Sequence, residues 1–342
     1  MPENQKEITI RGLAARLALS VATVSRALNH DSSVRPRTKK RVLDMAEALG
    51  YRTNDHARVL RNGRSQTIGC IVPSLDDHVM SRVVSGIEKS ARLLEYSLMV
   101  MQSCGCKETE AYCADILLGK RVDGLVISTP DGQNDLCRLR PYIQKNIPVV
   151  VLENAASEQG FVKILTDNRR AGYEMTRHLL ALGRKRIVHL TSDGSFKGHL
   201  ERCEGYRQAM AEAGLPVKER YIIRCGLSRQ DGMIAAEAVW QWKEKPDALF
   251  AANDRCAVGC ILALKKKGVR IPAEIAIAGF GNDPVSSASD PELTTVGYPG
   301  ETMGEAAVDQ LMHRMHGSHP RKSVETIVLR SNLIIRKSTV MD

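Results

Sequence analysis

Long apolar runs are missing from this sequence, which argues against a membrane-spanning protein. No stretch approaches the roughly 20 consecutive apolar residues that a bilayer-spanning helix needs. The first seven residues are polar, so an export signal of the usual apolar kind is not expected there. We therefore expect the protein to work in the cytoplasm, without a membrane partner.

Metal-binding cysteine spacing is also absent, although the chain contains nine cysteines. Cys104 and Cys106 are separated by one residue, and Cys256 and Cys260 by three. Neither spacing is the paired C-x-x-C of a zinc site. In a reducing compartment such thiols stay free, so we expect no metal and no cofactor.

Sequence motifs of nucleotide-dependent enzymes are missing as well. No G-x-G-x-x-G follows the first predicted strand, and no G-x-x-x-x-G-K-[ST] occurs. No Ser/His/Asp or Cys/His set stands at a recognisable motif spacing. The sequence therefore predicts a protein that is not an enzyme, and no catalytic residue is assigned.

Positive charge is concentrated in the first fifth of the chain. Of the net charge of +10, residues 1–64 carry +7 and residues 65–342 only +3. This asymmetry is typical of a small polyanion-binding head on a larger regulatory domain. Charge alone is equally compatible with a basic solvent-exposed surface. We predict two domains, a head at 1–64 and a large domain at 65–342.

Three short amphipathic helices are predicted in the head. They cover about 9–17, 20–29 and 37–49, with Thr9 and Ser20 as N-caps and Gly50 as a stop. In the second helix Val24, Ala27 and Leu28 share the apolar side. Two short helices joined by a tight turn and braced by a third indicate a helix-turn-helix. A plain three-helix bundle with a polar face is the alternative.

The outward face of the second helix has the residue types of a DNA reader. Val21 and Ala22 are small enough to let the helix enter a major groove. Arg26 suits a bidentate bond to guanine. Short polar groups suited to phosphates surround them: Ser20, Thr23, Ser25 and Asn29.

From Thr67 onward short apolar runs alternate with helical patterns. The expected strands are 68–72, 97–101, 124–127, 149–152, 163–166, 186–190, 221–223, 248–250 and 274–278. This βαβ order predicts parallel sheets covered on both faces. A break near residue 165 suggests two lobes, with a ligand in the cleft between them.

Several segments in combination resemble the lac repressor and galactose repressor family, over essentially the whole chain. They are 9–14, 20–29, 34–38 and 49–54 in the head, and 167–172, 178–187, 201–206, 253–254 and 293–296 beyond it. The resemblance implies a helix-turn-helix head plus an α/β domain of two parallel-sheet lobes, similar to periplasmic sugar-binding proteins. The lobes are expected at about 65–165 with 299–326, and about 166–298 with 327–342.

The resemblance also implies a hinge helix at about 54–61. Eight residues are too few for a stable isolated helix in water, so we expect this helix to be ordered only on operator DNA. Leu60 stands where family members insert a leucine into the minor groove. Thr53 departs from the proline that many relatives carry, and an inert linker is the alternative. Further DNA contacts are expected from Thr9, Tyr51, Asn54, Ala57 and Arg61. Family members dimerise, so we expect a homodimer on a pseudo-palindromic operator, acting as a repressor.

An effector site is implied by Arg202, Asn253 and Asp254, which match cleft residues of the family. For Arg202, the alternative is an ion pair with a neighbouring carboxylate such as Glu201. Two segments depart from the family pattern. Gly281 replaces a sugar-contacting aspartate, and 74–80 lacks the usual asparagine and aromatic cluster. Further effector contacts are expected from Asp76, His78, Phe196, Asn282 and Tyr298.

The predicted function is thus a sequence-specific DNA-binding regulator controlled by a small molecule, with a sugar or sugar acid expected first. The aromatic content of only 4% leaves few rings for stacking, so a small polar or acidic effector fits as well. The alternatives are a solute-binding protein and an effector-independent regulator.

Overall fold

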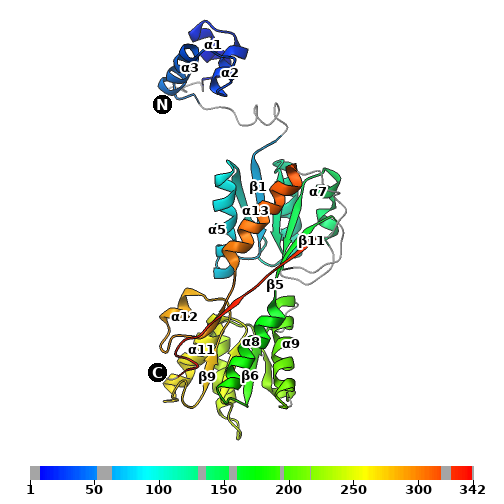
Figure 1. Ribbon diagram of the computed structural model, residues 1–342, viewed down its shortest axis with the longest axis vertical. Coiled ribbons are helices and arrows are strands. Elements are labelled where there is room, and N and C mark those ends of the chain that lie inside the picture. Colours follow the sequence, from blue (N-terminus) through cyan, green and yellow to red (C-terminus); the bar gives the residue numbers. More distant parts are fainter. Residues whose placement is uncertain are drawn as a thin grey trace. The chain divides into compact units, whose positions relative to one another are not determined.

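The computed structural model describes residues 8–51, 64–129, 136–153, 160–192, 196–215, 217–316 and 325–340. The chain divides into two compact units, Met1–Ser65 and Gln66–Asp342 (Figure 1). The predicted hinge, with Asn54, Ala57, Leu60 and Arg61, lies outside the described residues. Within the ranges given above, no helix has the length and apolar character needed to cross a bilayer.

The first unit consists of three short helices, α1 (Ile10–Leu17), α2 (Val21–Leu28) and α3 (Pro36–Ala48). The side chains of Thr9 and Ser20 accept hydrogen bonds from the first turns of α1 and α2. All three helices contribute to one apolar core, which includes Leu13, Leu17, Val24, Ala27 and Val42. The three predicted helices are confirmed, because each one's apolar stripe is the side that packs.

The second unit contains a six-stranded sheet in the order β11-β5-β4-β3-β1-β2, and its neighbouring strands are parallel. We call this sheet with its helices lobe 1. Its strands are β1 (Thr67–Val72), β2 (Ser97–Gln102), β3 (Gly124–Ser128), β4 (Val149–Leu152), β5 (Val162–Thr166) and β11 (Glu325–Leu329).

A four-stranded parallel sheet in the order β7-β6-β8-β9 forms, with its helices, what we call lobe 2. Its strands are β6 (Ile187–Thr191), β7 (Ile222–Arg224), β8 (Ala248–Ala251) and β9 (Ala276–Ala278). A separate antiparallel pair joins β10 (Thr295–Gly297) to β12 (Asn332–Ile334). The sequence patterns did not predict β10, β11 or β12, because two of these strands have three residues each and the third is half-exposed without clean alternation.

Both sheets are covered on two faces by helices (Figure 1). In lobe 1, α5 (His78–Leu93) and α13 (Gly300–His316) pack on one face, and α6 (Lys107–Gly119) and α7 (Arg140–Gln144) on the other. In lobe 2, α8 (Asn168–Ala181) and α9 (Lys197–Glu212) oppose α10 (Arg229–Trp240) and α11 (Asp254–Lys266). Three short helices complete the unit: η1 (Cys137–Leu139), η2 (Glu219–Tyr221) and α12 (Pro284–Ala288).

Glycines let paired helices touch backbone to backbone. A Cβ added at Gly205 of α9 would lie 2.0 Å from the Arg169 carbonyl oxygen of α8, and one added at Gly172 would lie 2.3 Å from the Arg202 carbonyl oxygen. Equivalent crossings join α10 to α11 and α5 to α13, through Gly232 and Gly259, and Gly86 and Gly304. Because only glycine permits this approach, the crossing fixes Arg202 close to the start of α8.

Candidate DNA-binding face and effector site

The outward face of α2 carries small side chains and one long basic side chain. Val24 and Ala27 are fully buried in the head core, whereas Val21 is 43% exposed. Ala22 and Arg26 are exposed as well. The helix therefore presents small residues and a guanidinium to solvent, as the sequence predicted for a helix that enters a groove.

The polar residues predicted around this face also stabilise α2. Ser20 accepts a hydrogen bond from Thr23 N over 3.1 Å, and the hydroxyls of these two residues lie 2.8 Å apart. At the other end, Nδ2 of Asn29 donates to the carbonyl oxygen of Ser25. These contacts shape the helix ends, and the hydroxyls at the N-terminus lie where the helix has partial positive charge.

Thr9 and Tyr51 are the remaining predicted DNA contacts in the described head. Thr9 is exposed and its hydroxyl caps α1, accepting from Gly12 N over 3.2 Å. Tyr51 packs against the head core, and burial raises the pKa of its hydroxyl. Both residues therefore have structural partners whether or not DNA is bound.

Arg202 lies in a buried polar environment in lobe 2. Its side chain is 5% exposed; Nε donates to Oδ1 of Asn168 over 2.9 Å, and Nη1 to the carbonyl oxygen of Ala252 over 2.8 Å. The guanidinium carbon is 3.5 Å from the ring centroid of Phe280, a cation–π distance. The two hydrogen bonds of this side chain thus use Nε and Nη1.

The Glu153 carboxylate, directly after β4, completes this network from lobe 1. Its Oε1 accepts from the backbone and hydroxyl of Thr166 over 2.9 and 2.7 Å, and from the Tyr298 hydroxyl over 2.7 Å. Its Oε2 accepts from Nδ2 of Asn168 over 3.1 Å. Burial raises the pKa of Glu153, although these donors and the charge of Arg202 oppose the shift.

Arg202 keeps its positive charge at neutral pH despite its burial. Loss of hydration lowers its pKa to about 10, and the negative charge of Glu153 limits this decrease. The neighbouring Glu201 pairs with Lys197 over 3.3 Å. Glu201, the carboxylate named for the alternative ion-pair role of Arg202, thus pairs with Lys197, and the negative charge that acts most strongly on Arg202 is that of Glu153.

Phe196 and Tyr298 lie beside the same network. The Phe196 ring is near enough to Asn168 that a Cβ at Gly198 would meet both side chains. Phe196 also contacts the His199 ring edge-on, with centroids 4.9 Å apart. Nδ1 of His199 lies 2.7 Å from the Ser192 hydroxyl, and burial lowers the pKa of this imidazole to about 3.

Asn253 and Asp254 begin α11, and their side chains bond within the protein. Oδ1 of Asn253 caps the helix by accepting from Cys256 N over 2.8 Å, and Nδ2 donates to the Leu227 carbonyl oxygen over 3.1 Å. Asp254 is 1% exposed and accepts from the Thr295 hydroxyl over 2.6 Å. Burial raises its pKa to about 6.

The turn that contains Asn282 is held in place by hydrogen bonds within lobe 2. Asn282 has a φ of 52°, and its Oδ1 accepts from Nη2 of Arg336 over 2.8 Å. The backbone N–H of Asp283 donates to Oδ2 of Asp254 over 2.8 Å. The side-chain oxygen of Asn282 thus has a partner inside lobe 2.

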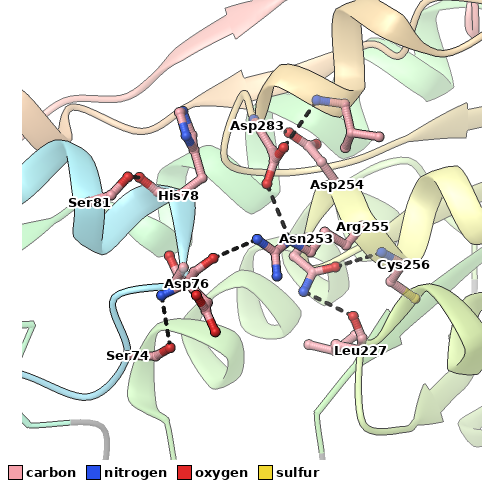
Figure 2. A network of polar contacts seen from close by, with 12 residues as sticks. Ser74, Asp76, His78, Ser81, Leu227, Asn253, Asp254, Arg255, Cys256 and Asp283 are labelled. Atoms are coloured by element: carbon pink, nitrogen blue, oxygen red, sulfur yellow. Dashed lines mark hydrogen bonds and ion pairs between the residues drawn. The ribbon is translucent and has the colours of Figure 1, made fainter. Parts of the chain in front are cut away.

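Asp76 and His78 lie on lobe 1, near α11 of lobe 2. Figure 2 shows the Arg255 side chain reaching both Asp76 and Asp283, with His78 nearby. Nη2 of Arg255 donates to the backbone oxygen of Asp76 over 2.6 Å, and Nε to Oδ2 of Asp283 over 3.4 Å. Asp76 is exposed, and His78 is partly buried at the first turn of α5.

The structure therefore brings the predicted effector residues into two neighbouring groups. One contains Arg202, Phe196 and Tyr298, and the other Asp76, His78, Asn253, Asp254 and Asn282.

Sequence reasoning missed Glu153, Asn168 and Arg255. A signal existed for Glu153, since a carboxylate directly after a buried strand lies at the sheet edge where ligands bind. Asn168 was part of a matched family segment, but nothing in its neighbours predicts a bond to Arg202. Arg255 follows the predicted Asn253 and Asp254 and gave no separate signal.

Within the described ranges, no group of three or more His, Cys, Asp or Glu side chains is arranged to hold a metal ion. What the structure presents is a helix-turn-helix head and a two-lobed α/β unit with a buried arginine and carboxylate network. These features define a DNA-binding regulatory protein with a separate ligand-binding unit.

Comparison with known families agrees with this class. Residues 9–54 match the family model of bacterial regulatory proteins, lacI family, and residues 65–336 match periplasmic binding proteins and sugar binding domain of LacI family. The second match covers well over half of the chain. The protein belongs to the LacI family of bacterial regulators.

Individual relatives match over nearly their whole length. The transcriptional regulator DegA of Bacillus subtilis is 30% identical over 335 residues, 97% of this chain and 98% of that protein. Catabolite control protein A of Priestia megaterium is 29% identical over 335 residues, 97% and 99% of the two chains. The solved lac repressor dimer bound to operator and the anti-inducer ONPF matches with a TM-score of 0.89 at 26% identity, over 98% of this chain and 100% of that one. The predicted fold class and the predicted role as a DNA-binding regulator are confirmed.

Proposed function

We propose that this protein represses transcription by reading operator DNA with α2, and that a small molecule bound between the lobes changes its affinity for that DNA. The observation that carries the proposal is the outward face of α2, where Val21, Ala22 and Arg26 project from a head with its own core. Small residues admit the helix to a major groove, and the guanidinium supplies two donors for a guanine.

The functional form is proposed to be a homodimer in the cytoplasm. The lac repressor match is a dimer on its operator, and two heads related by a twofold axis suit a pseudo-palindromic site. The hinge at 54–61, with Leu60 as the minor-groove residue, belongs to this proposal and lies outside the described residues. No enzymatic activity is expected, because the relatives named above are regulators.

The effector is proposed to be a sugar or sugar acid. One matched family model is described as a sugar-binding domain, and a planar guanidinium suits paired hydroxyls or a carboxylate. We assign direct contacts to Arg202, Phe196, Tyr298, Asp76 and His78. Asn253, Asp254 and Asn282 are assigned to the same site, and their side chains also bond within the protein.

A selection experiment with the full-length protein tests the DNA-binding role. Duplexes bound from a random pool at physiological salt should converge on one pseudo-palindromic sequence. On the selected duplex, Arg26→Ala should weaken binding by about 1 to 3 kcal/mol, with little change on random DNA. Arg16→Ala, which removes an exposed cation from α1, is the matched control and should weaken both duplexes slightly and equally. A pool that never converges, with and without candidate sugars, would refute the proposal.

A further inference from the structure

One side chain joins two segments that belong to different lobes. The segments are 74–80, in lobe 1, and the Gly281–Asp283 turn, in lobe 2. Arg255, at the second position of α11, bonds to Asp76 in the first segment and to Asp283 in the second. The network can be followed in Figure 2.

The contact with lobe 1 is made to the backbone. Nη2 of Arg255 donates over 2.6 Å to the carbonyl oxygen of Asp76, and not to its carboxylate. The position of that oxygen depends on the path of the chain from Ser74 to Asp77. A bond to it therefore constrains the segment itself, while the Asp76 side chain remains exposed and available.

The contact with lobe 2 is made to a side chain whose residue forms further hydrogen bonds within that lobe. Oδ2 of Asp283 accepts from Nε of Arg255, Oδ1 caps α12 by accepting from Val285 N over 3.0 Å, and the Asp283 N–H donates to the buried Asp254. Asp283, the acceptor for Arg255, is thus held by two further hydrogen bonds. The lobe 2 end of the connection is well fixed.

A second approach between the lobes lies beside this one. A Cβ at Gly281 would lie 3.7 Å from Cγ2 of Val79 in α5, an ordinary van der Waals distance. The Gly281 turn and the start of α5 are therefore neighbours, with Arg255 bridging the same two elements through polar bonds. A side chain larger than hydrogen at 281 would project toward α5.

We propose that Arg255 is a positioning residue: it holds the Ser74–Asp77 segment in register with the Gly281–Asp283 turn, and so sets where Asp76 and His78 lie relative to lobe 2. An effect of Arg255 on the response to effector rests on the proposed function. The bridge itself does not, because both of its hydrogen bonds are made within the chain.

An exposed ion pair alone would not carry this proposal. The Arg255 side chain is 53% exposed, and surface pairs contribute little on average. The distinguishing feature is that one planar group serves two acceptors on different lobes, which a point charge does not reproduce. The test must therefore separate bridging from charge and from general stability.

Hydrogen exchange of the full-length protein, without effector or DNA, makes that separation. In Arg255→Ala we expect amides of 75–80 to exchange about three- to tenfold faster, as loss of one charge-assisted hydrogen bond predicts. The thermal midpoint should stay near that of the wild type. The matched control is Lys266→Ala, at the exposed far end of α11. In this variant the exchange rates of the 75–80 amides should stay within about twofold of those of the wild type.

Arg255→Lys keeps the charge without the planar fork and should restore less than half of the lost protection. Full restoration by lysine, unchanged exchange in Arg255→Ala, or faster exchange throughout the large unit with a lowered midpoint would each overturn the proposal. The outcome is independent of the selection experiment: failure to find an operator would refute the proposed function and leave the bridge intact.

Discussion

Arg202 and Asn168 are joined side chain to side chain, with Nε of the arginine donating to Oδ1 of the asparagine over 2.9 Å. Both residues are buried. Asn168 donates in turn to Glu153, so a neutral amide stands between a cation of lobe 2 and a carboxylate of lobe 1. Removal of the amide would leave both charged partners short of a hydrogen bond in a poorly hydrated place.

Asn168→Ala should therefore lower the free energy of unfolding by about 2 to 3 kcal/mol, since a buried donor and a buried carboxylate each lose a partner. Urea unfolding followed by circular dichroism measures the loss. Gln208→Ala, which removes an exposed amide bonded to Glu212 on α9, is the control and should change stability by less than about 0.5 kcal/mol. A loss as small as the control's would mean that water replaces the amide.

Arg202→Ala should abolish effector binding and spare operator binding. A thermal-shift screen of the wild type against sugars, sugar acids and nucleobases should find a stabilising compound, because a ligand at 100 times its dissociation constant adds about 2.7 kcal/mol. The variant should show no shift with that compound. Arg207 lies five residues after Arg202 in α9 and pairs with Glu219. Arg207→Ala should retain the shift. Should Arg202→Ala still respond fully, the guanidinium is not a ligand contact.

Gly205→Ala should destabilise the large unit by about 1 to 3 kcal/mol. The added methyl group would lie 2.0 Å from the Arg169 carbonyl oxygen and 2.6 Å from Tyr173 N, so α8 and α9 must separate. Gly119→Ala serves as the control, because a Cβ there meets nothing within 4 Å; it should be neutral or slightly stabilising. Thermal and urea unfolding compare the two. Equal midpoints would show that the helix crossing relaxes at little free-energy cost.

His199 makes stability depend on pH. Burial lowers its pKa to about 3, whereas a histidine in an unfolded chain titrates near 6.5. Between these values the unfolded chain binds a proton that the folded protein excludes, so stability is complete above about pH 6.5 and falls as the pH drops toward 3. His199→Asn should therefore make the slope of unfolding free energy against pH shallower between about pH 4 and 6, by up to about 1.4 kcal/mol per unit.

Asp254 acts in the opposite sense over part of this range. Its pKa is raised to about 6, so its contribution becomes more favourable as the pH falls from about 6 toward its unfolded value near 3.9. Because the wild type and His199→Asn both contain Asp254, this contribution cancels when their slopes are subtracted. Identical slopes in urea unfolding would show that His199 is not held neutral in the folded protein.

The head was largely predictable from local pattern. Thr9 and Ser20 cap their helices as expected, and Val24 and Ala27 are buried as their spacing predicted. Each of these features depends on residues within one or two helical turns. The long strands of both sheets were predictable for the same reason, whereas β10 and β12 are too short for a pattern to develop.

The sequence indicated which residues belong to the candidate effector site better than it indicated which partners they contact. Arg202 was assigned from the family resemblance, but its partners Asn168 and Glu153 come from 34 and 49 residues earlier in the chain. Their proximity results from the α8–α9 crossing at Gly172 and Gly205 and from the position of β4 beside β5. No local pattern in the sequence predicts that helix crossing.

By itself, the sequence determined the class of protein: a basic three-helix head, alternating strands and helices, and motifs that place the chain in its family. These are properties of short segments, in which helix periodicity and capping operate over a few residues. Only the tertiary structure decided what the consecutive residues Asn253, Asp254 and Arg255 do. Asn253 precedes the helix in an extended conformation, and its side chain caps α11. Asp254 and Arg255 are successive helix positions, which point about 100° apart, so the first is buried against Thr295 and the second reaches Asp76 of the other lobe.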